Sequence, residues 1–431
     1  MNQPSKRIPR NTLLLIIVAA LGYFVDIYDL ILFNVVKKES LLSLGYTDPE
    51  IIKDISISLF NWQMGGMLIG GLLWGVLGDK KGRLKVLFGS ILLYSLANIL
   101  NAFVTTIPAY ALVRFIAGIG LAGELGAGIT LVSEMMSKEN RGYGTMVIVT
   151  FGALGAVLAA MVGGEGHVMA GFIGDVTGLV LANWQVAYIV GGGLGLILLL
   201  LRVGALESGM FKNLPSHKEV SKGDLLKLLA NKESRIRYFH CIICGLPVWF
   251  AAGVLFALAE YLSQPDMLNI QGRVVNGTAV MFGYIGLSIG DLLSGLLSQL
   301  IRSRKKIIVL YLMLCCASVL FYLFAAQGRT PEFFYACCLI AGVTAGYWAL
   351  FVTNAAEQFG TNVRSTVANT VPNFVRGAVI PITALFKALE APMGVIGSAC
   401  TVGLLCVALA LYSTFRLKET FGKDLDYIET L

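Results

Sequence analysis

The chain is 431 residues long; 56% of its residues are hydrophobic and only 14% are charged. A soluble domain carries about 25% charged residues, and a chain of this length could not bury so much apolar surface in water. Composition therefore excludes a water-soluble protein and predicts a polytopic membrane protein. The three histidines and eight scattered cysteines form no ligand pattern, so we expect no metal, no disulfide framework and no cofactor.

Twelve apolar segments of membrane-spanning length follow one another along the chain. The first, Thr12–Val36, is too long for a signal peptide and has no cleavage pattern after it, so it predicts a retained helix. The other predicted spans are Ser56–Leu77, Leu84–Val104, Pro108–Ser133, Tyr143–Gly163, Trp184–Leu206, Phe239–Leu262, Val275–Ile301, Ile307–Ala326, Glu332–Thr353, Thr366–Leu389 and Met393–Phe415.

A polar stretch divides these spans into two groups of six. We therefore predict an all-α membrane protein of two pseudo-symmetric six-helix bundles, residues 1–210 and residues 239–431, the second with a short cytoplasmic tail. Residues 211–238 form the predicted cytoplasmic linker. Within it, Asp224–Ala230 predicts a short amphipathic helix on the membrane surface. A plain linker and a regulatory segment are both compatible with this pattern.

The basic residues of the connecting segments divide unequally between the two sides of the membrane. With a cytoplasmic N-terminus, 25 lysines and arginines lie on the cytoplasmic side and five on the opposite side. Positive charge is concentrated in the cytoplasmic loops of membrane proteins. Both termini are therefore predicted to be cytoplasmic, in the cell's inner membrane. The net charge of +7 follows from this asymmetry, so no nucleic-acid partner is expected.

A repeated pair of charges indicates that the two halves are duplicated units. Glu134 and Arg141 follow the fourth span, and Glu357 and Arg364 follow the tenth span with the same spacing of seven residues. We interpret both pairs as latches at equivalent cytoplasmic helix ends. In membrane proteins built from such repeats, the binding site lies between the halves.

The loop after the second span carries a motif of glycines and charges. Gly75, Asp79, Gly82 and Arg83 fit the pattern G-x-L-x-D-x-x-G-R, and Lys85 follows. The glycines allow close approach and a tight turn, and Asp79 at a helix end can act as a conformational latch. The motif resembles the loop signature of the major facilitator superfamily. This resemblance implies a twelve-helix transporter, not an enzyme, that works by rocker-switch alternating access.

Other segments extend the resemblance to both ends of the chain. Residues 114–120 are similar to a further motif of the superfamily, R-x-x-x-G-x-G. Residues 134–142, 202–208, 356–364 and 418–426 resemble patterns shared by sugar porters and metabolite–proton symporters. Phe24–Asp29 resembles motifs of both metabolite–proton and aromatic-acid symporters, whereas Gly120–Gly126 favours the metabolite–proton group. Leu125 stands where that group has tryptophan. These motifs therefore do not identify the substrate.

Ionisable residues inside the spans mark candidate sites, because each costs about 2.5–3.5 kcal/mol to insert at mid-membrane. Asp26 and Asp29 are three residues apart in the first span, so we expect both on one face, towards the bundle interior. We interpret these two, Glu124 and Asp291 as proton-coupling residues. Alternatively, the two aspartates are structural and are satisfied by the backbone and by Arg114, which is expected to neutralise one of them.

A polar stripe follows one face of the eleventh span. Its members, every three or four residues, are Thr366, Asn369, Asn373, Arg376, Thr383 and Lys387. Such a stripe predicts the wall of an aqueous cavity, and Arg376 near its centre favours an anionic or zwitterionic solute. The alternative is a structural ion pair between Arg376 and Asp291. Other residues predicted to line the cavity are Tyr347, Trp348, Gln63 and Arg114.

These features predict proton-coupled uptake of a small polar organic solute by a monomer in the lipid bilayer. The fifth span contains glycines but no proline, which favours symport. The alternative is proton-driven export of a drug, siderophore or metabolite, and sodium in place of protons stays open. A non-transporting membrane sensor would carry a large soluble domain, and the sequence predicts none.

Overall fold

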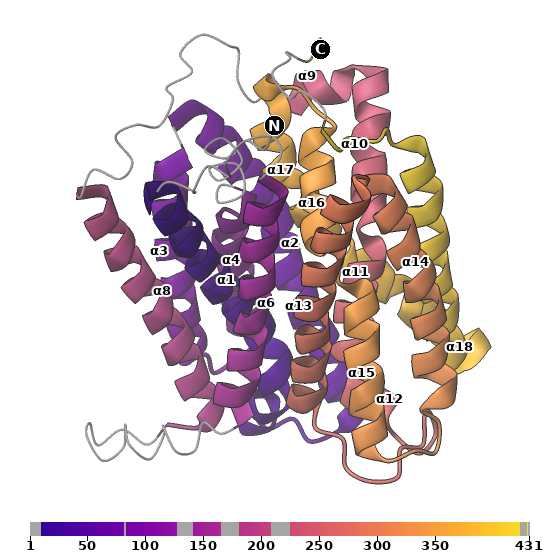
Figure 1. The fold of residues 1–431 in the computed structure, drawn as a ribbon. Helices are drawn as coiled ribbons and strands as arrows, with labels where there is room; N and C mark the ends of the chain where they lie inside the picture. Colours follow the sequence, from indigo (N-terminus) through magenta and orange to yellow (C-terminus); the bar gives the residue numbers. More distant parts are fainter. Residues whose placement is uncertain are drawn as a thin grey trace.

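The computed structural model describes residues 10–81, 83–126, 141–164, 181–207, 225–422 and 429. Every regular element of these residues is a helix (Figure 1). Nine of the described helical stretches are long and apolar enough to cross a membrane. The prediction of an all-α membrane protein is therefore confirmed, whereas the count of twelve crossings stays a prediction.

The helices of the first half are long, and most begin and end near the predicted boundaries. Thr106 caps the fourth span by accepting a hydrogen bond from the Ala109 amide (3.4 Å), and Pro108 occupies its first turn. The described helices of this half are α1 (Arg10–Ser43), α2 (Pro49–Lys81), α3 (Arg83–Asn101), α4 (Ile107–Leu121), α6 (Arg141–Gly164) and α8 (Asn183–Glu207).

The helices of the second half are more interrupted. They are α9 (Leu225–Ala230), α10 (Lys232–Cys244), α11 (Leu246–Phe250), η1 (Ala251–Phe256), α12 (Ala259–Leu262), α13 (Asn276–Ile301), α14 (Arg304–Leu320), η2 (Phe321–Ala325), α15 (Pro331–Ala345), α16 (Trp348–Glu357), α17 (Thr361–Gly377) and α18 (Val379–Arg416). The elements η1 and η2 are π-helical turns. Helix α9 lies within the segment predicted as the linker, whose role stays a prediction. Gly394, at φ 68° and ψ 169°, divides α18 where the predicted eleventh and twelfth spans meet.

Close glycine contacts recur at equivalent helices of the two halves. A Cβ atom on Gly118 of α4 would lie 2.1 Å from the Gln63 carbonyl oxygen of α2. A Cβ atom on Gly342 of α15 would lie 2.1 Å from the Gly283 carbonyl oxygen of α13. The backbones therefore touch at both crossings, and no other residue fits there. The second and fourth spans of each half pack in the same way, as expected for duplicated units.

The two halves contact each other at both ends of the bundle. Helix α9 lies at one end of the bundle, here called the terminal end, and α12 lies at the other, the distal end (Figure 1). Between the middle of the bundle and the terminal end, Asn373 Nδ2 of α17 donates to the Ala122 carbonyl oxygen (2.8 Å). At the distal end, Asn276 Nδ2 of α13 donates to the Asn34 carbonyl oxygen of α1 (2.7 Å). Side chains midway between these contacts are enclosed.

The outer surface of the bundle is apolar. Leu200 of α8 and Leu300 of α13 are 71% and 78% exposed, and many other large hydrophobic side chains are also exposed. Such a surface suits a hydrocarbon solvent, in which a helix satisfies all of its own backbone polar groups.

Candidate functional site

A buried ion pair joins the two halves near the middle of the bundle. Arg376 Nη2 of α17 lies 3.6 Å from Asp26 Oδ2 of α1, and both side chains are essentially inaccessible to solvent. Arg376 also donates to Asn373 Oδ1 (3.3 Å) and to the Tyr23 hydroxyl (3.4 Å). The sequence predicted Arg376 and Asn373 on one face of their helix, and the structure places both at the interface with the first half.

Aromatic side chains line the second-half side of this pair. The Arg376 guanidinium lies 5.8 Å from the centre of the Trp249 ring. Trp249 in turn packs edge-to-face on Trp348, with ring centroids 6.1 Å apart. Trp348 was a predicted cavity residue, whereas Trp249 and Tyr23 were missed. Tyr23 had a usable signal, because it is three residues before Asp26 and shares its helix face.

The two aspartates of α1 face different helices. Asp26 faces α17, whereas Asp29 lies against Gly191 of α8, where an added Cβ would be 2.3 Å from Asp29 Oδ1. The Asn98 amide of α3 also lies beside the Asp29 carboxylate. Three residues rotate a helix by about 300°, so the two side chains diverge by about 60°. This angle is enough to send one aspartate to the interface between the halves and the other into the first half.

Arg114 does not neutralise an aspartate in the described part of the chain, which corrects that expectation. Its guanidinium donates to the Tyr188 hydroxyl (3.0 Å), to the Leu59 carbonyl oxygen (3.3 Å) and to Gln63 Oε1. It also stacks 3.8 Å from the Phe33 ring centre. Arg114 and Gln63 are therefore bound to each other within the first half, where their contacts are structural.

Glu124 forms a buried ion pair inside the first half. Arg202 of α8 donates to Glu124 Oε2 from Nη1 (3.0 Å) and to Oε1 from Nη2, a two-point contact. Both side chains are almost fully buried. Sequence reasoning counted Arg202 among the cytoplasmic charges, because it lies near a helix end, and therefore missed this pair. Of the carboxylates predicted to couple protons, Glu124 is the one held most firmly, because both of its oxygens are bound by Arg202.

Asp291 stabilises a break in the tenth span and does not pair with Arg376. The helix stops at Gly346 and restarts at Trp348, and Asp291 Oδ1 accepts the backbone amide of Ala349 (2.9 Å) in the first turn of α16. A carboxylate at a helix N-terminus satisfies an otherwise free amide. The alternative of an Arg376–Asp291 lock is therefore wrong. Tyr347 is likewise engaged, because its hydroxyl donates to the Cys244 carbonyl oxygen (2.9 Å).

Asn369 joins the halves at the terminal end. Its Nδ2 lies 3.3 Å from the Gly71 carbonyl oxygen of α2. With the amide turned over, it bonds the Ala122 carbonyl oxygen (3.1 Å) and the Gly75 amide (3.0 Å) instead. Either orientation connects α17 to the first half. Gly75, a predicted latch residue, therefore lies at this crossing.

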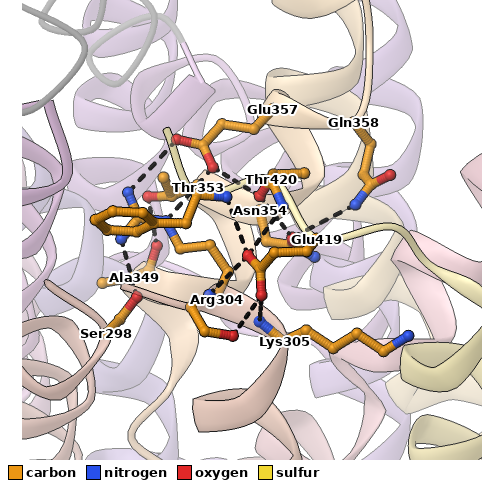
Figure 2. A network of polar contacts seen from close by, with 12 residues as sticks. Ser298, Arg304, Lys305, Ala349, Thr353, Asn354, Glu357, Gln358, Glu419 and Thr420 are labelled. Atoms are coloured by element: carbon orange, nitrogen blue, oxygen red, sulfur yellow. Dashed lines mark hydrogen bonds and ion pairs between the residues drawn. The ribbon is translucent and has the colours of Figure 1, made fainter. Parts of the chain in front are cut away.

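Glu357, one member of the predicted latch pair of the second half, takes part in a larger network (Figure 2). Glu357 lies 3.4 Å from Arg304 Nε and accepts a hydrogen bond from the Thr420 hydroxyl (2.8 Å). Arg304 also donates to Ser298 Oγ (3.0 Å). Arg364 donates to the Phe359 carbonyl oxygen (3.4 Å). The partner of Glu357 is therefore the start of α14, and the tail after α18 is tied to the same place.

Glu419 of this tail caps the N-terminus of α14. Its carboxylate accepts hydrogen bonds from the Arg304 and Lys305 amides (2.9 and 3.2 Å) and from Ser303 Oγ (Figure 2). Burial alone would raise the pKa of the Glu419 carboxyl, but the hydrogen bonds from Ser303 and from backbone amides hold it below its ordinary value.

The remaining predicted latch residues lie outside the side chains that the structure describes. Gly82 and Glu134 lie outside the described residues. For Asp79, Arg83 and Arg141 the structure describes a helical backbone and no side chain. Their role as latches stays a prediction.

Comparison with known proteins identifies the family. The sequence profile of the Major Facilitator Superfamily matches residues 19–384. The chain is 28% identical to a candidate niacin/nicotinamide transporter, NiaP, of Bacillus subtilis, over 82% of this chain and 85% of that protein. It is 27% identical to the 3-(3-hydroxy-phenyl)propionate transporter of Escherichia coli, over 82% and 83%.

The fold is similar to that of a solved transporter. The crystal structure of FucP in the outward conformation superposes with a TM-score of 0.70 at 15% identity, covering 95% of this chain and all of that one. The fold, the apolar surface and the profile match agree, and the resemblance seen in the loop motif is confirmed. The chain is a membrane transporter that belongs to the major facilitator superfamily.

Proposed function

We propose that this protein takes up a small aromatic or heteroaromatic carboxylate together with a proton. The ion pair between Arg376 and Asp26 carries the proposal, because it places one cation and one titratable anion at the interface between the halves. Niacin and 3-(3-hydroxyphenyl)propionate, two of the compounds for which these relatives are named, both combine a ring with a carboxylate; nicotinamide, also named for the first relative, has the ring without the charge.

Arg376 supplies the chemistry for binding a carboxylate. A guanidinium presents paired N–H donors that match the two oxygens of a carboxylate, and it stacks on aromatic faces. The Trp249 ring beside it, backed by Trp348, offers an apolar surface for the ring of the substrate. An acid with an aromatic ring therefore satisfies both parts of the site.

Asp26 supplies the coupling. When Asp26 is charged it occupies Arg376, and a substrate carboxylate must displace it. When Asp26 is protonated it loses its attraction to Arg376, and the guanidinium is free to bind substrate. Proton and substrate then bind together, and loss of the proton on the other side restores the internal ion pair and expels the carboxylate. This competition gives rise to a coupling free energy between the binding of the proton and the binding of the substrate carboxylate.

Contacts between the halves at the two ends serve as gates in this proposal. At the distal end, Lys38 pairs with Glu260, and Lys387 pairs with Asp54 (2.8 Å). At the terminal end, Asn369 Nδ2 of α17 lies 3.3 Å from the Gly71 carbonyl oxygen of α2. Opening one end breaks only its own contacts, so the Arg376 site would face each side in turn. The distribution of basic residues supports a distal end outside the cell and both termini in the cytoplasm.

Transport of labelled nicotinate into liposomes containing the purified protein tests the proposal. With an inward proton gradient, we expect uptake that benzoate inhibits and that nicotinamide inhibits at least tenfold less well. The amide is a matched control, because it keeps the ring and loses the charge that Arg376 would bind. Equal inhibition by acid and amide would contradict the role of Arg376. Proton-driven loss of preloaded nicotinate would favour export. Uptake driven only by a sodium gradient would show that sodium, and not a proton, is the coupling ion.

A further inference from the structure

A groove lies on the seam between the two halves, on the outer surface of the bundle and apart from the Arg376 site. Its volume is about 620 Å³. One wall is formed by residues 54–69 of α2, and the other by residues 380–387 of α18. Trp62 and Ile69 of the first wall are 51% and 45% exposed. The groove therefore opens towards the apolar surface that suits the hydrocarbon of a membrane.

Polar contacts join the two walls of the groove. Asp54 Oδ2 of α2 lies 2.8 Å from Lys387 Nζ of α18, and Asn61 Nδ2 donates to Thr383 Oγ1 (3.1 Å). Asn61 and Thr383 therefore satisfy each other across the groove. Asp54 and Lys387 are each about half exposed at its distal end, so both charges of this pair are accessible to a ligand.

The lining of the groove changes from polar to apolar with distance from this pair. Ser58 lies one helical turn deeper than Asp54 on the same face of α2, and its side chain is exposed. Deeper in the groove, the lining side chains Leu68, Phe115 and Ile380 are apolar. A ligand with a charged end and a long apolar part matches this order of side chains.

The length of the groove matches one leaflet of a bilayer. Residues 54–69 cover about 22 Å of helix axis, and half of a bilayer with its headgroup region is about 20–22 Å thick. Asp54 precedes Ser56, the predicted start of the second span, by two residues, so the charged end lies at the level of the headgroups. A small aromatic acid would fill only a short part of this length, whereas an acyl chain would fill most of it.

We propose that the groove binds one phospholipid of the distal leaflet, with an acyl chain between α2 and α18 and the headgroup on the Asp54–Lys387 pair. The phosphate binds Lys387 and a headgroup amine binds Asp54, so neither charge is left without a partner when the two separate. The Ser58 hydroxyl donates to an ester oxygen one turn deeper. The lipid bridges the two halves beside the distal gate, and its binding does not depend on which solute is carried.

Native mass spectrometry of the purified protein with added palmitoyl-oleoyl phosphatidylethanolamine tests the proposal. We expect the wild type to retain one lipid and Gly65→Leu to lower the retained fraction at least fivefold. A Cβ atom on Gly65 would lie 4.0 Å from Ile380 Cδ1 and from Phe115 Cε2, so the leucine side chain extends into the groove without a backbone clash. Gly193→Leu is the matched control: a Cβ atom on Gly193 of α8 has nothing within 4 Å. It should leave retention within 1.5-fold of wild type.

Two lysines at the distal end test the headgroup contact. Lys387→Gln should lower retention at least threefold, whereas Lys38→Gln, which breaks the ion pair with Glu260 outside the groove, should leave it unchanged. Phosphatidylglycerol has no amine for Asp54, so we expect it to be retained at least threefold less than phosphatidylethanolamine; equal retention would overturn the amine contact. Thermal unfolding of each variant shows whether it is folded.

Equal retention by the wild type, Gly65→Leu and Lys387→Gln would overturn the proposal, because the retained lipid would then lie elsewhere on the apolar surface. A wild type that retains no phospholipid would overturn it as well, and photolabelling of the groove by azidobenzoate would then assign the groove to the solute. The measurement needs no transport, so its failure and the failure of the proposed function are distinguishable.

Discussion

Replacing Asp26 by asparagine tests the coupling mechanism most sharply. The substitution keeps the shape of the side chain and removes the charge that lies 3.6 Å from Arg376. At an effective dielectric constant of about 20, two unit charges at this distance attract by about 5 kcal/mol. Desolvation cancels much of this attraction, and the pair makes no hydrogen bond at this distance, so we take about 1.5–3 kcal/mol, the low end of the coupling energies of close charge pairs.

This range sets the expected change in affinity. In the wild type at high pH, a substrate carboxylate must displace the charged Asp26, whereas in Asp26→Asn it does not. The variant should therefore bind nicotinate about ten- to a hundredfold more tightly at high pH. In the wild type affinity should fall as pH rises and Asp26 loses its proton; in the variant affinity should stay flat.

Equilibrium binding of labelled nicotinate to the detergent-solubilised protein from pH 5.5 to pH 8.5 measures both effects. Asp29→Asn is the matched control, since it makes the same change on the same helix and leaves the Arg376 pair intact. The control should retain the pH dependence of binding. Weaker binding by Asp26→Asn, with an unchanged pH dependence, would refute the competition between Asp26 and substrate.

Three further predictions concern other charges of the bundle. Arg376→Lys should weaken binding of aromatic acids by about tenfold or more in the same assay, because lysine lacks the planar fork that matches a carboxylate. Glu124→Gln should destabilise the protein by about 3–5 kcal/mol, since it leaves Arg202 as an unpaired buried charge. In thermal unfolding, the double variant Glu124→Gln with Arg202→Met should be more stable than Glu124→Gln alone, and a further loss would contradict the pairing. Glu419→Gln should lower the melting temperature at pH 7. Because the folded pKa of Glu419 is depressed, its contribution is present above its unfolded pKa of about 4.3 and is lost as pH falls below it. The difference from wild type should shrink on acidification.

The fold was largely predictable because membrane-spanning helices can be recognised in a sequence from their length and hydrophobicity. The short helix in the linker and the polar face of the eleventh span follow from local sequence patterns, and the observed break at Gly394 lies one residue after the predicted start of the twelfth span at Met393. The π-helical turns and the interruption between α15 and α16 could not be predicted from local sequence patterns, because they depend on packing against neighbouring helices. The sequence identified Asp291 as a buried charge, but it did not show that this carboxylate caps the first turn of α16.

The pairing of charges was the least predictable part of the site. Sequence patterns located Arg376 and Asp26 as buried charges, but their contact joins residues 350 positions apart and depends on how the two halves face each other. Arg202 looked like a loop charge, because helix length alone does not show that its side chain turns inward to Glu124. Helix periodicity also placed Asp26 and Asp29 on one face, although a 60° divergence is enough to separate their neighbours.

One measurement tests the central claim most directly: internal pH in liposomes containing the protein, held at zero membrane potential, after nicotinate is added outside. The account predicts that nicotinate carries protons inward and acidifies the lumen in the wild type. It also predicts that Asp26→Asn exchanges labelled nicotinate without any change in pH. Entry of nicotinate into wild-type liposomes with no pH change, or with alkalinisation, would contradict proton symport through the Arg376–Asp26 pair.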